Sequence, residues 1–321
     1  MDLAPCQLVR EGRPFGSLFS EDNWELFEQR DRKLDGVGAS PRTLLAHGNN
    51  IIIGLDNGEI KIYSNADLQC KQVLAHSKLV SEVACLQSTS TEVIAGYRDA
   101  IICIWNIQSG DLVRRFCAGN RASDNGYAKF LHLKGTKLAV ASMDGKVGIW
   151  KYENSSIKFL SGWKSLGSPM QVGIHGNHII LMEHSGFVGV YDFNGALVYK
   201  IGNPAEVRGV GIYEGYAIVG NKNCTVEIWD IKTGQRLVEL EGHIGEVDYV
   251  SVHANYFLTS DSRGSVVVWS IEAALQGRPA AIVKLSDSRG SNWRSIFCQY
   301  SLGQNFLVRS THGIIKVTDF L

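Results

Sequence analysis

Hydrophobic and polar positions alternate in short runs along most of the chain, and the same arrangement of runs recurs seven times. Each copy has a short apolar run, a polar turn and an alternating segment that ends on one closing residue. The closing residues are Tyr63, Trp105, Trp150, Tyr191, Trp229, Trp269 and Thr318. Alternation with a period of two buries one face of a β-strand. The pattern therefore predicts short strands with one buried face throughout the repeats.

The spacing of the copies predicts how these strands are arranged. Successive closing residues are 42, 45, 41, 38, 40 and 49 positions apart. A period near 40 residues that contains only short strands is typical of propeller blades with four strands each. We therefore expect an all-β fold, a seven-bladed β-propeller of four-stranded antiparallel blades that occupies residues 1–321 as a single domain.

The two ends of the chain predict how the last blade is closed. The seventh copy stops at Leu321, just after its third strand, and Gln7–Arg10 reads as a strand without a blade of its own. Pairing the two would bury an otherwise open sheet edge. We expect Gln7–Arg10 to be the outer strand of the last blade.

Residues 11–41 do not fit the repeat. Within them, Glu21–Leu34 places Trp24, Leu26 and Phe27 among charged residues, and Ser20 can cap a helix N-terminus. We expect a short amphipathic helix in a non-repeat insertion. It could cover apolar surface of the ring, which we favour, or dock a partner.

Composition limits the classes of partner and compartment. The chain has 32 Lys and Arg against 32 Asp and Glu, so it lacks the field of a general nucleic-acid or membrane-surface binder. No apolar run approaches the roughly 20 residues that span a bilayer, and the N-terminus lacks a signal-peptide pattern. Its 7 cysteines are odd in number and scattered, as in a reduced compartment. We expect a soluble intracellular protein of the cytoplasm, the nucleus or both.

The repeat resembles that of the WD-repeat β-propellers. The resemblance rests on Gly242-His243, on Trp269 in the same copy, and on the pair Trp229-Asp230. It implies that His243, and His76 in the second copy, are hydrogen-bonded structural groups. It also implies an acidic residue in a tight turn six positions before each closing residue, which here remains only as Asp99 and Asp144. We therefore expect few copies to form the buried hydrogen-bond network of the family.

A search for catalytic and metal-binding patterns finds little. The sequence has neither a phosphate-binding G-x-x-x-x-G-K-[ST] loop nor a G-x-S-x-G nucleophile elbow. His175 and His178 are spaced like metal ligands on a helix, but Gly176-Asn177 between them marks a turn. We expect no catalytic residue, no metal and no cofactor, while a hydrolase with its site at the channel mouth stays open as an alternative.

A second resemblance concerns the rim of the propeller. Ala95–Asp99 and Val207-Arg208 are similar to segments of the F-box/WD substrate receptors, in which arginines at this rim hold phosphorylated peptides. Guanidinium groups match phosphate oxygens with paired, charge-assisted hydrogen bonds. The expected rim positions near the first strands are Ser81, Ala128, Gln171, Arg208, Asp248 and Arg294. The partner-binding candidates are Arg98, Arg208, Lys222, Arg294 and Tyr97.

These observations favour a non-catalytic protein-interaction scaffold that binds an acidic or phosphorylated peptide at the rim. Its partners would be other proteins or peptides, with no membrane, nucleic acid or small-molecule substrate inferred. The alternative within the same class is a structural subunit of a multiprotein assembly that uses side surfaces and the helix predicted within residues 11–41.

Overall fold

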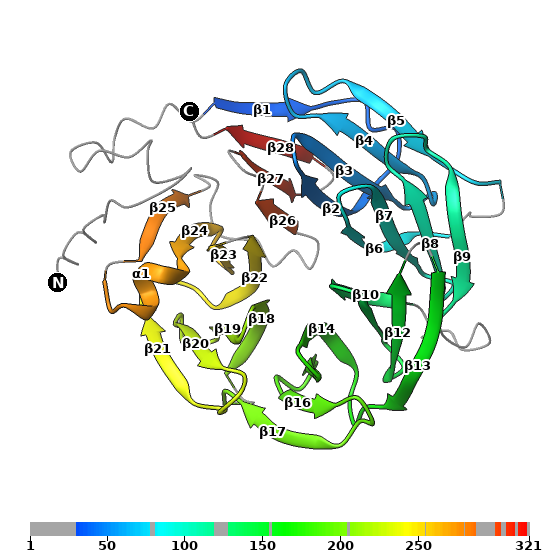
Figure 1. The fold of residues 1–321 in the computed structure, drawn as a ribbon. Coiled ribbons are helices and arrows are strands. Elements are labelled where there is room, and N and C mark those ends of the chain that lie inside the picture. Colours follow the sequence, from blue (N-terminus) through cyan, green and yellow to red (C-terminus); the bar gives the residue numbers. More distant parts are fainter. Residues whose placement is uncertain are drawn as a thin grey trace.

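The computed structural model shows a ring of four-stranded antiparallel sheets around a central axis (Figure 1). It describes residues 30–77, 81–118, 128–153, 156–203, 206–253, 255–278, 280–286, 299–302, 306–311 and 314–319. In this part of the chain there are seven such sheets. The predicted propeller of four-stranded antiparallel blades is confirmed.

Six blades are each formed by four consecutive strands, ordered from the inner to the outer edge. Blade 1 contains β2 (Pro41–His47), β3 (Asn50–Leu55), β4 (Ile60–Ser64) and β5 (Cys70–Leu74). Blade 2 contains β6 (Val83–Ser88), β7 (Glu92–Tyr97), β8 (Ile101–Asn106) and β9 (Leu112–Cys117). Blade 3 contains β10 (Ala128–Lys134), β11 (Lys137–Ser142), β12 (Lys146–Glu153) and β13 (Ser156–Lys164).

The next three blades repeat this order. Blade 4 contains β14 (Pro169–His175), β15 (His178–Glu183), β16 (Val188–Asp192) and β17 (Leu197–Ile201). Blade 5 contains β18 (Val207–Tyr213), β19 (Tyr216–Asn221), β20 (Val226–Asp230) and β21 (Arg236–Leu240). Blade 6 contains β22 (Val247–His253), β23 (Tyr256–Asp261), β24 (Ser265–Ser270) and β25 (Ala281–Ser286). The helix α1 (Ile271–Leu275) lies between β24 and β25.

The remaining sheet, the composite blade, combines the two ends of the described chain. Its strands β26 (Gln299–Leu302), β27 (Phe306–Thr311) and β28 (Ile314–Asp319) are completed by β1 (Arg30–Leu34), which pairs antiparallel with β28. In Figure 1 the blue strand β1 lies beside the red β28. An N-terminal strand does complete this sheet, but the prediction of its position was wrong, because Arg30–Leu34 occupies the outer edge. The segment Gln7–Arg10 lies outside the described residues.

The same strand corrects the predicted helix. Residues 30–34, the last part of the expected helix Glu21–Leu34, are extended in β1, and residues 21–29 lie outside the described part. Arg32 shows why an extended strand is favoured here. Its guanidinium donates to the carbonyl oxygen of Ala66 at 3.2 Å and to Oδ1 of Asn65 at 2.9 Å, both in blade 1. Backbone pairing and this contact with the neighbouring blade outweigh the helical pattern.

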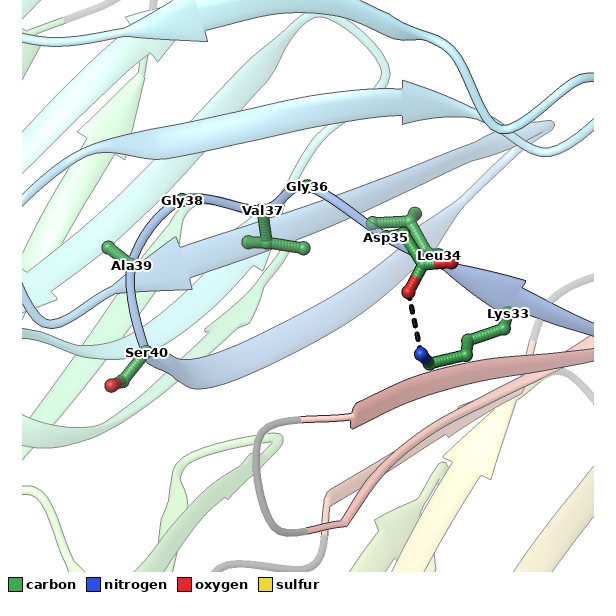
Figure 2. Close-up of a pocket in the computed structure, with 8 residues that line it drawn as sticks. All are labelled: Lys33, Leu34, Asp35, Gly36, Val37, Gly38, Ala39 and Ser40. Atoms are coloured by element: carbon green, nitrogen blue, oxygen red, sulfur yellow. Dashed lines mark ion pairs between the residues drawn. The ribbon is translucent and has the colours of Figure 1, made fainter.

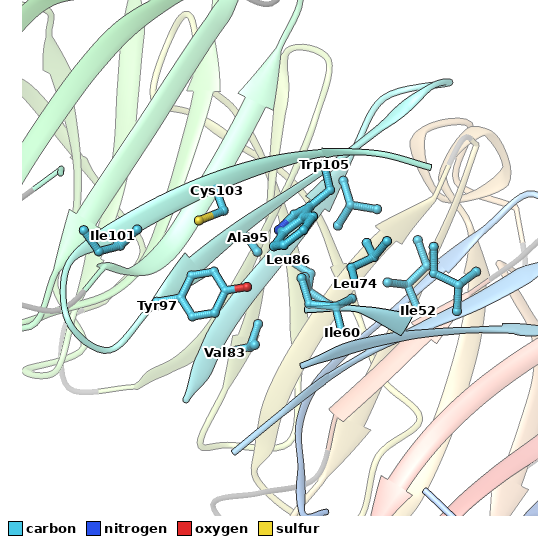
Figure 3. Close-up of a cluster of buried hydrophobic side chains, with 12 residues drawn as sticks. Ile52, Ile60, Leu74, Val83, Leu86, Ala95, Tyr97, Ile101, Cys103 and Trp105 are labelled. Carbon is cyan, nitrogen blue, oxygen red and sulfur yellow. The ribbon is translucent and has the colours of Figure 1, made fainter. Parts of the chain in front are cut away.

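Each inner strand contacts the inner strands of both neighbouring sheets, so β2, β6, β10, β14, β18, β22 and β26 close a ring. Apolar side chains fill the seams between blades. Figure 3 shows the seam between blades 1 and 2, where Ile52, Ile60 and Leu74 of blade 1 pack with Tyr97 and Trp105 of blade 2. Burial of such side chains is the main force that holds blades together.

Blade 6 carries the complete polar network, in keeping with the expectation that few copies form one. In blade 6, Nδ1 of His243 lies 2.9 Å from Oδ2 of Asp261, and Nε2 of His243 lies 2.6 Å from Oγ1 of Thr259. Nε1 of Trp269 donates to the same hydroxyl at 2.6 Å. The acid is Asp261 rather than a residue at position 263, where the resemblance placed it. His243 is a buried structural group, as predicted.

Candidate functional site

One end of the ring gathers the turns between second and third strands and the loops that join successive blades. We call this end the upper face. In five blades the first residue of the turn between the second and third strands donates its backbone N–H to a carbonyl oxygen. That oxygen belongs to the residue just before the inner strand of the same blade. These bonds join Asp56 to Ser40, Arg98 to Glu82, His184 to Ser168, Lys222 to Glu206 and Ser262 to Glu246. They hold the two kinds of rim position side by side in five blades.

The inner strands present their second residue to the upper face in a specific way. Each of the six continuous blades has a register shift there, between the first and third residues of the inner strand. Such a bulge leaves one residue unpaired and redirects its side chain. The residues concerned are Arg42, Ala84, Lys129, Met170, Arg208 and Asp248.

These positions correct the rim predicted from the sequence. The expected Ser81, Ala128 and Gln171 are out of register by one to three residues, and the equivalent positions hold Ala84, Lys129 and Met170. Counting from apolar anchors cannot reveal a bulge of one residue. Lys129 in blade 3 was missed as a result, and Arg42 in blade 1 was missed because the predicted positions cover only the second to seventh copies.

Two arginines from neighbouring blades face one carboxylate on this face, and a lysine of the next blade lies near enough to interact with it electrostatically. Oε2 of Glu82 lies 3.4 Å from Nη1 of Arg98 and 3.6 Å from Nε of Arg42. Arg98 is well exposed, with 61% of its side-chain surface accessible, whereas Arg42 and Glu82 are more enclosed. We call Arg42, Glu82, Arg98 and Lys129 the Glu82 cluster.

Lys129 belongs to this cluster electrostatically. Burial lowers the pKa of its ammonium group, the Glu82 carboxylate opposes that shift, and the Arg98 cation adds to it. A partly desolvated ammonium group gains strongly from an additional anion nearby. The Glu82 cluster therefore has the charge and the desolvation that favour an anionic group.

The other basic candidates lie on the same face in a second group, across the ring in blades 5 and 6. Nε of Arg208 lies 3.2 Å from Oε2 of Glu246, and both side chains are exposed to similar degrees. Lys222 and Arg263 are exposed in the turns of these blades. The predicted cations Arg98, Arg208 and Lys222 thus share a face but form two separate groups.

Two predicted partner-binding residues, Tyr97 and Arg294, are not part of the upper face as the structure describes it. Tyr97 is fully buried in the seam between blades 1 and 2, where its hydroxyl donates to the carbonyl oxygen of Gly58 at 3.4 Å. Its ring is large and apolar, so it packs in the core, and it cannot anchor a partner without unfolding the seam. Arg294 lies outside the described residues and stays a prediction.

The described residues contain few other features with site chemistry. A cavity of about 410 Å³ is lined by Lys33–Ser40, which comprise the end of β1 and the loop that leads to β2 (Figure 2). Its charged side chains, Lys33 and Asp35, pair with each other at 2.7 Å. Within the described part, no group of three His, Cys, Asp or Glu residues could hold a metal ion. His175 and His178 end β14 and begin β15, so the turn predicted between them is confirmed.

A different surface lies on the outer edges of three adjacent blades. The outermost strand of each blade has one unpaired edge, and large apolar side chains are exposed on three of these strands. The side chains are Phe159 and Leu160 on β13, Leu197 and Val198 on β17, and Leu237 on β21. We call these five residues the outer apolar band. Exposed apolar residues on sheet edges are a common means of protein association.

Comparison with known proteins agrees with this architecture. No protein-family model matches the sequence. The chain is 24% identical over 226 residues to Actin-interacting protein 1-2 of Arabidopsis thaliana, and 23% identical over 196 residues to Shk1 kinase-binding protein 15 of Schizosaccharomyces pombe. These matches cover 66% and 58% of this chain. They span only 36% and 54% of the relatives' own lengths.

Solved structures give the same fold at low sequence identity. The WD40 β-propeller domain of Doa1 superposes with a TM-score of 0.68 and 16% identity, covering 91% of this chain and 96% of that domain. The computationally designed Ika8 protein superposes with a TM-score of 0.60 and 21% identity, covering 89% and 98%. The closed ring and these matches make the chain a β-propeller.

The type of propeller follows from the same observations. The His243–Thr259–Asp261–Trp269 network and the Doa1 superposition agree with the resemblance seen in the sequence. The chain has the WD-repeat β-propeller fold. No helix in the part of the chain that the structure describes is long and apolar enough to cross a membrane.

Proposed function

We propose that this propeller is a non-catalytic protein-interaction scaffold whose upper face binds an acidic or phosphorylated peptide, in the manner of a substrate receptor. The observation that carries the proposal is the Glu82 cluster, in which Arg42, Arg98 and Lys129 converge from three blades. Strands hold the backbones of Arg42 and Lys129, and a backbone hydrogen bond to Glu82 holds that of Arg98, so little ordering is needed on binding. The two curated relatives are named for binding to actin or to a kinase, which supports a protein partner.

Substitution of the exposed arginine tests this proposal. We expect Arg98→Ala to weaken binding of a fluorescent degenerate peptide library with a fixed central phosphoserine by about tenfold, because one charge-assisted contact is lost. Fluorescence anisotropy at several salt concentrations measures this change, and binding of the wild-type chain should weaken as salt rises. Arg208→Ala tests the second group in the same assay.

The matched control is Lys151→Ala, which removes an exposed cation in β12 that pairs with Glu153. It should bind the library as the wild-type chain does. Equal affinity in the wild-type, Arg98→Ala and Arg208→Ala chains would reject the receptor function.

A second candidate function rests on the outer apolar band. We infer that a structural subunit of a larger assembly would use these exposed edges, since two of the three strands, β13 and β17, expose a pair of large apolar side chains. Of the helix expected within residues 11–41, residues 30–34 are a strand. Residues 11–29 lie outside the described part, so a contribution of that segment to this candidate stays a prediction. No observation in the described residues favours the hydrolase alternative.

A further inference from the structure

Glu82 occupies the centre of the basic group on the upper face. A single oxygen, Oε2, faces both Arg42 and Arg98, at 3.6 and 3.4 Å. Both distances exceed those of a tight charge-assisted hydrogen bond, which is about 2.7–2.9 Å. One oxygen of the carboxylate therefore offsets the positive charge of both arginines.

The backbone of this cluster is fixed from several sides. Arg42 and Lys129 occupy the same bulged position in blades 1 and 3, and Arg98 begins the tight turn of blade 2 between them. The backbone N–H of Arg98 donates to the carbonyl oxygen of Glu82 at 3.0 Å. The cluster therefore has fixed backbones, while the long, exposed side chain of Arg98 is able to change partner.

We propose that Arg42, Arg98 and Lys129 form a subsite for one phosphoryl group, and that Glu82 is an internal counter-ion which this group displaces. The inference rests on the proposed function, because it names the ligand class and the regulation of the same site.

The chemistry of the exchange favours a phosphoryl group over a carboxylate. A ligand carboxylate would replace the Glu82 carboxylate with a group of the same charge, and Glu82 competes at the high effective concentration of a tethered group. A phosphoryl group brings about 1.5 to 2 negative charges and three acceptor oxygens near neutral pH. One oxygen can then face each of the three cations. Glu82 thus weakens the binding of any anion, so that only a group with more charge than a carboxylate displaces it.

The second basic group supplies the comparison. Glu246 occupies the same place before the inner strand of blade 6 as Glu82 does in blade 2. It pairs with Arg208 alone among the described ion pairs, at 3.2 Å. A matched substitution at Glu246 removes the same charge from an equivalent position without touching the Glu82 cluster.

The test compares Glu82→Gln with Glu246→Gln in the full chain. The probes are degenerate peptide libraries with a fixed central phosphoserine, glutamate or serine, and binding is followed by fluorescence anisotropy. We expect Glu82→Gln to bind the phosphoserine library at least about fivefold more tightly and to bind the glutamate library measurably, because the competing carboxylate is gone. Glu246→Gln should tighten binding of both libraries clearly less than Glu82→Gln does, because the charge that it removes faces a single arginine. Thermal unfolding establishes that both variants are folded.

The outcomes separate the two proposals. Unchanged or weaker phosphoserine binding by Glu82→Gln, with binding by the wild-type chain intact, would overturn the counter-ion role and leave the receptor function standing. Equal tightening in Glu82→Gln and Glu246→Gln would overturn the assignment of the subsite, since general charge removal would explain it. Absence of phosphoserine binding in every chain would overturn the proposed function and this inference together.

Discussion

At the scale of single residues, the buried network of blade 6 shows how polar groups are accommodated in a largely apolar ring. Burial raises the pKa of Asp261, but hydrogen bonds from His243 and from backbone N–H groups outweigh that effect, and the net shift is downward. Asp261 also accepts backbone N–H bonds from Arg263 and Ser265, both at 2.9 Å. One carboxylate thus connects the loop before the blade with the tight turn inside it.

We predict that Asp261→Asn lowers the free energy of unfolding by about 2 kcal/mol at pH 7, because a buried, charge-assisted network loses its acceptor. A depressed pKa means that the stabilisation is present above the unfolded-state value near 4 and is lost as pH falls through the folded-state value. The difference from the wild-type chain should therefore shrink at pH 3. Urea unfolding at the two pH values measures it.

The control for this prediction is Asp35→Asn, since Asp35 is a highly exposed aspartate in the loop after β1. It should change stability little at either pH. A difference between wild type and Asp261→Asn that stays constant down to pH 3 would show that the ionised carboxylate does not stabilise the network.

At the scale of elements, strand β1 closes the ring by joining the composite blade to blade 1. Leu34 and Val37 are buried in an apolar cluster with Ile315 and Val317 of β28 and with residues of blade 1. The Lys61 ammonium of blade 1 donates to the carbonyl oxygen of Val37 at 2.7 Å. The loop between β1 and β2 is therefore fixed to both sheets.

We predict that Arg32→Ala destabilises the chain by about 1.5–3 kcal/mol, because hydrogen bonds from a charged group to blade 1 are lost at this closure. Urea unfolding at pH 7 measures the loss. Lys33→Ala is the matched control. Lys33 lies on the same strand, and its exposed side chain pairs with the exposed Asp35. Such a surface ion pair contributes at most about 1 kcal/mol to stability. Equal stability of the two variants would contradict the role of Arg32 in closure.

The strands of the repeats were predictable, whereas β1 was not. Strands such as β8 and β24 alternate or run apolar and end near a large aromatic, Trp105 or Trp269, so burial alone specifies them. The sequence of β1, Arg-Asp-Arg-Lys-Leu, has only one apolar residue, and its conformation depends on β28, about 280 residues away in the chain. Pairing between distant segments cannot be deduced from a local pattern of apolar residues.

The candidate site was predictable in part for a related reason. Arg98 follows the second strand directly, and turn chemistry identifies that position. Arg42 and Lys129 stand on bulges, where one extra residue changes the register without a sequence signal. Tyrosine is common at protein interfaces, but its aromatic ring packs equally well between two blades. Only the arrangement of the blades shows that Tyr97 is buried in the seam.

At the scale of the whole molecule, a neutral chain carries an uneven distribution of charge. The ring brings cations of blades 1 to 3 to one part of the upper face, while apolar edges of blades 3 to 5 face outward. A closed ring keeps these surfaces apart, because each blade is fixed between two neighbours. A measurement that identifies the residues protected by a bound partner can therefore distinguish the upper face from the outer apolar band.

Amide hydrogen exchange in the presence of the phosphoserine peptide library tests the central claim most directly. We expect slower exchange at the upper-face turns, above all around Arg98 and at the start of β10, with no change on β13, β17 and β21. Protection confined to those outer strands, with the turns exchanging as in the free chain, would contradict binding at the Glu82 cluster.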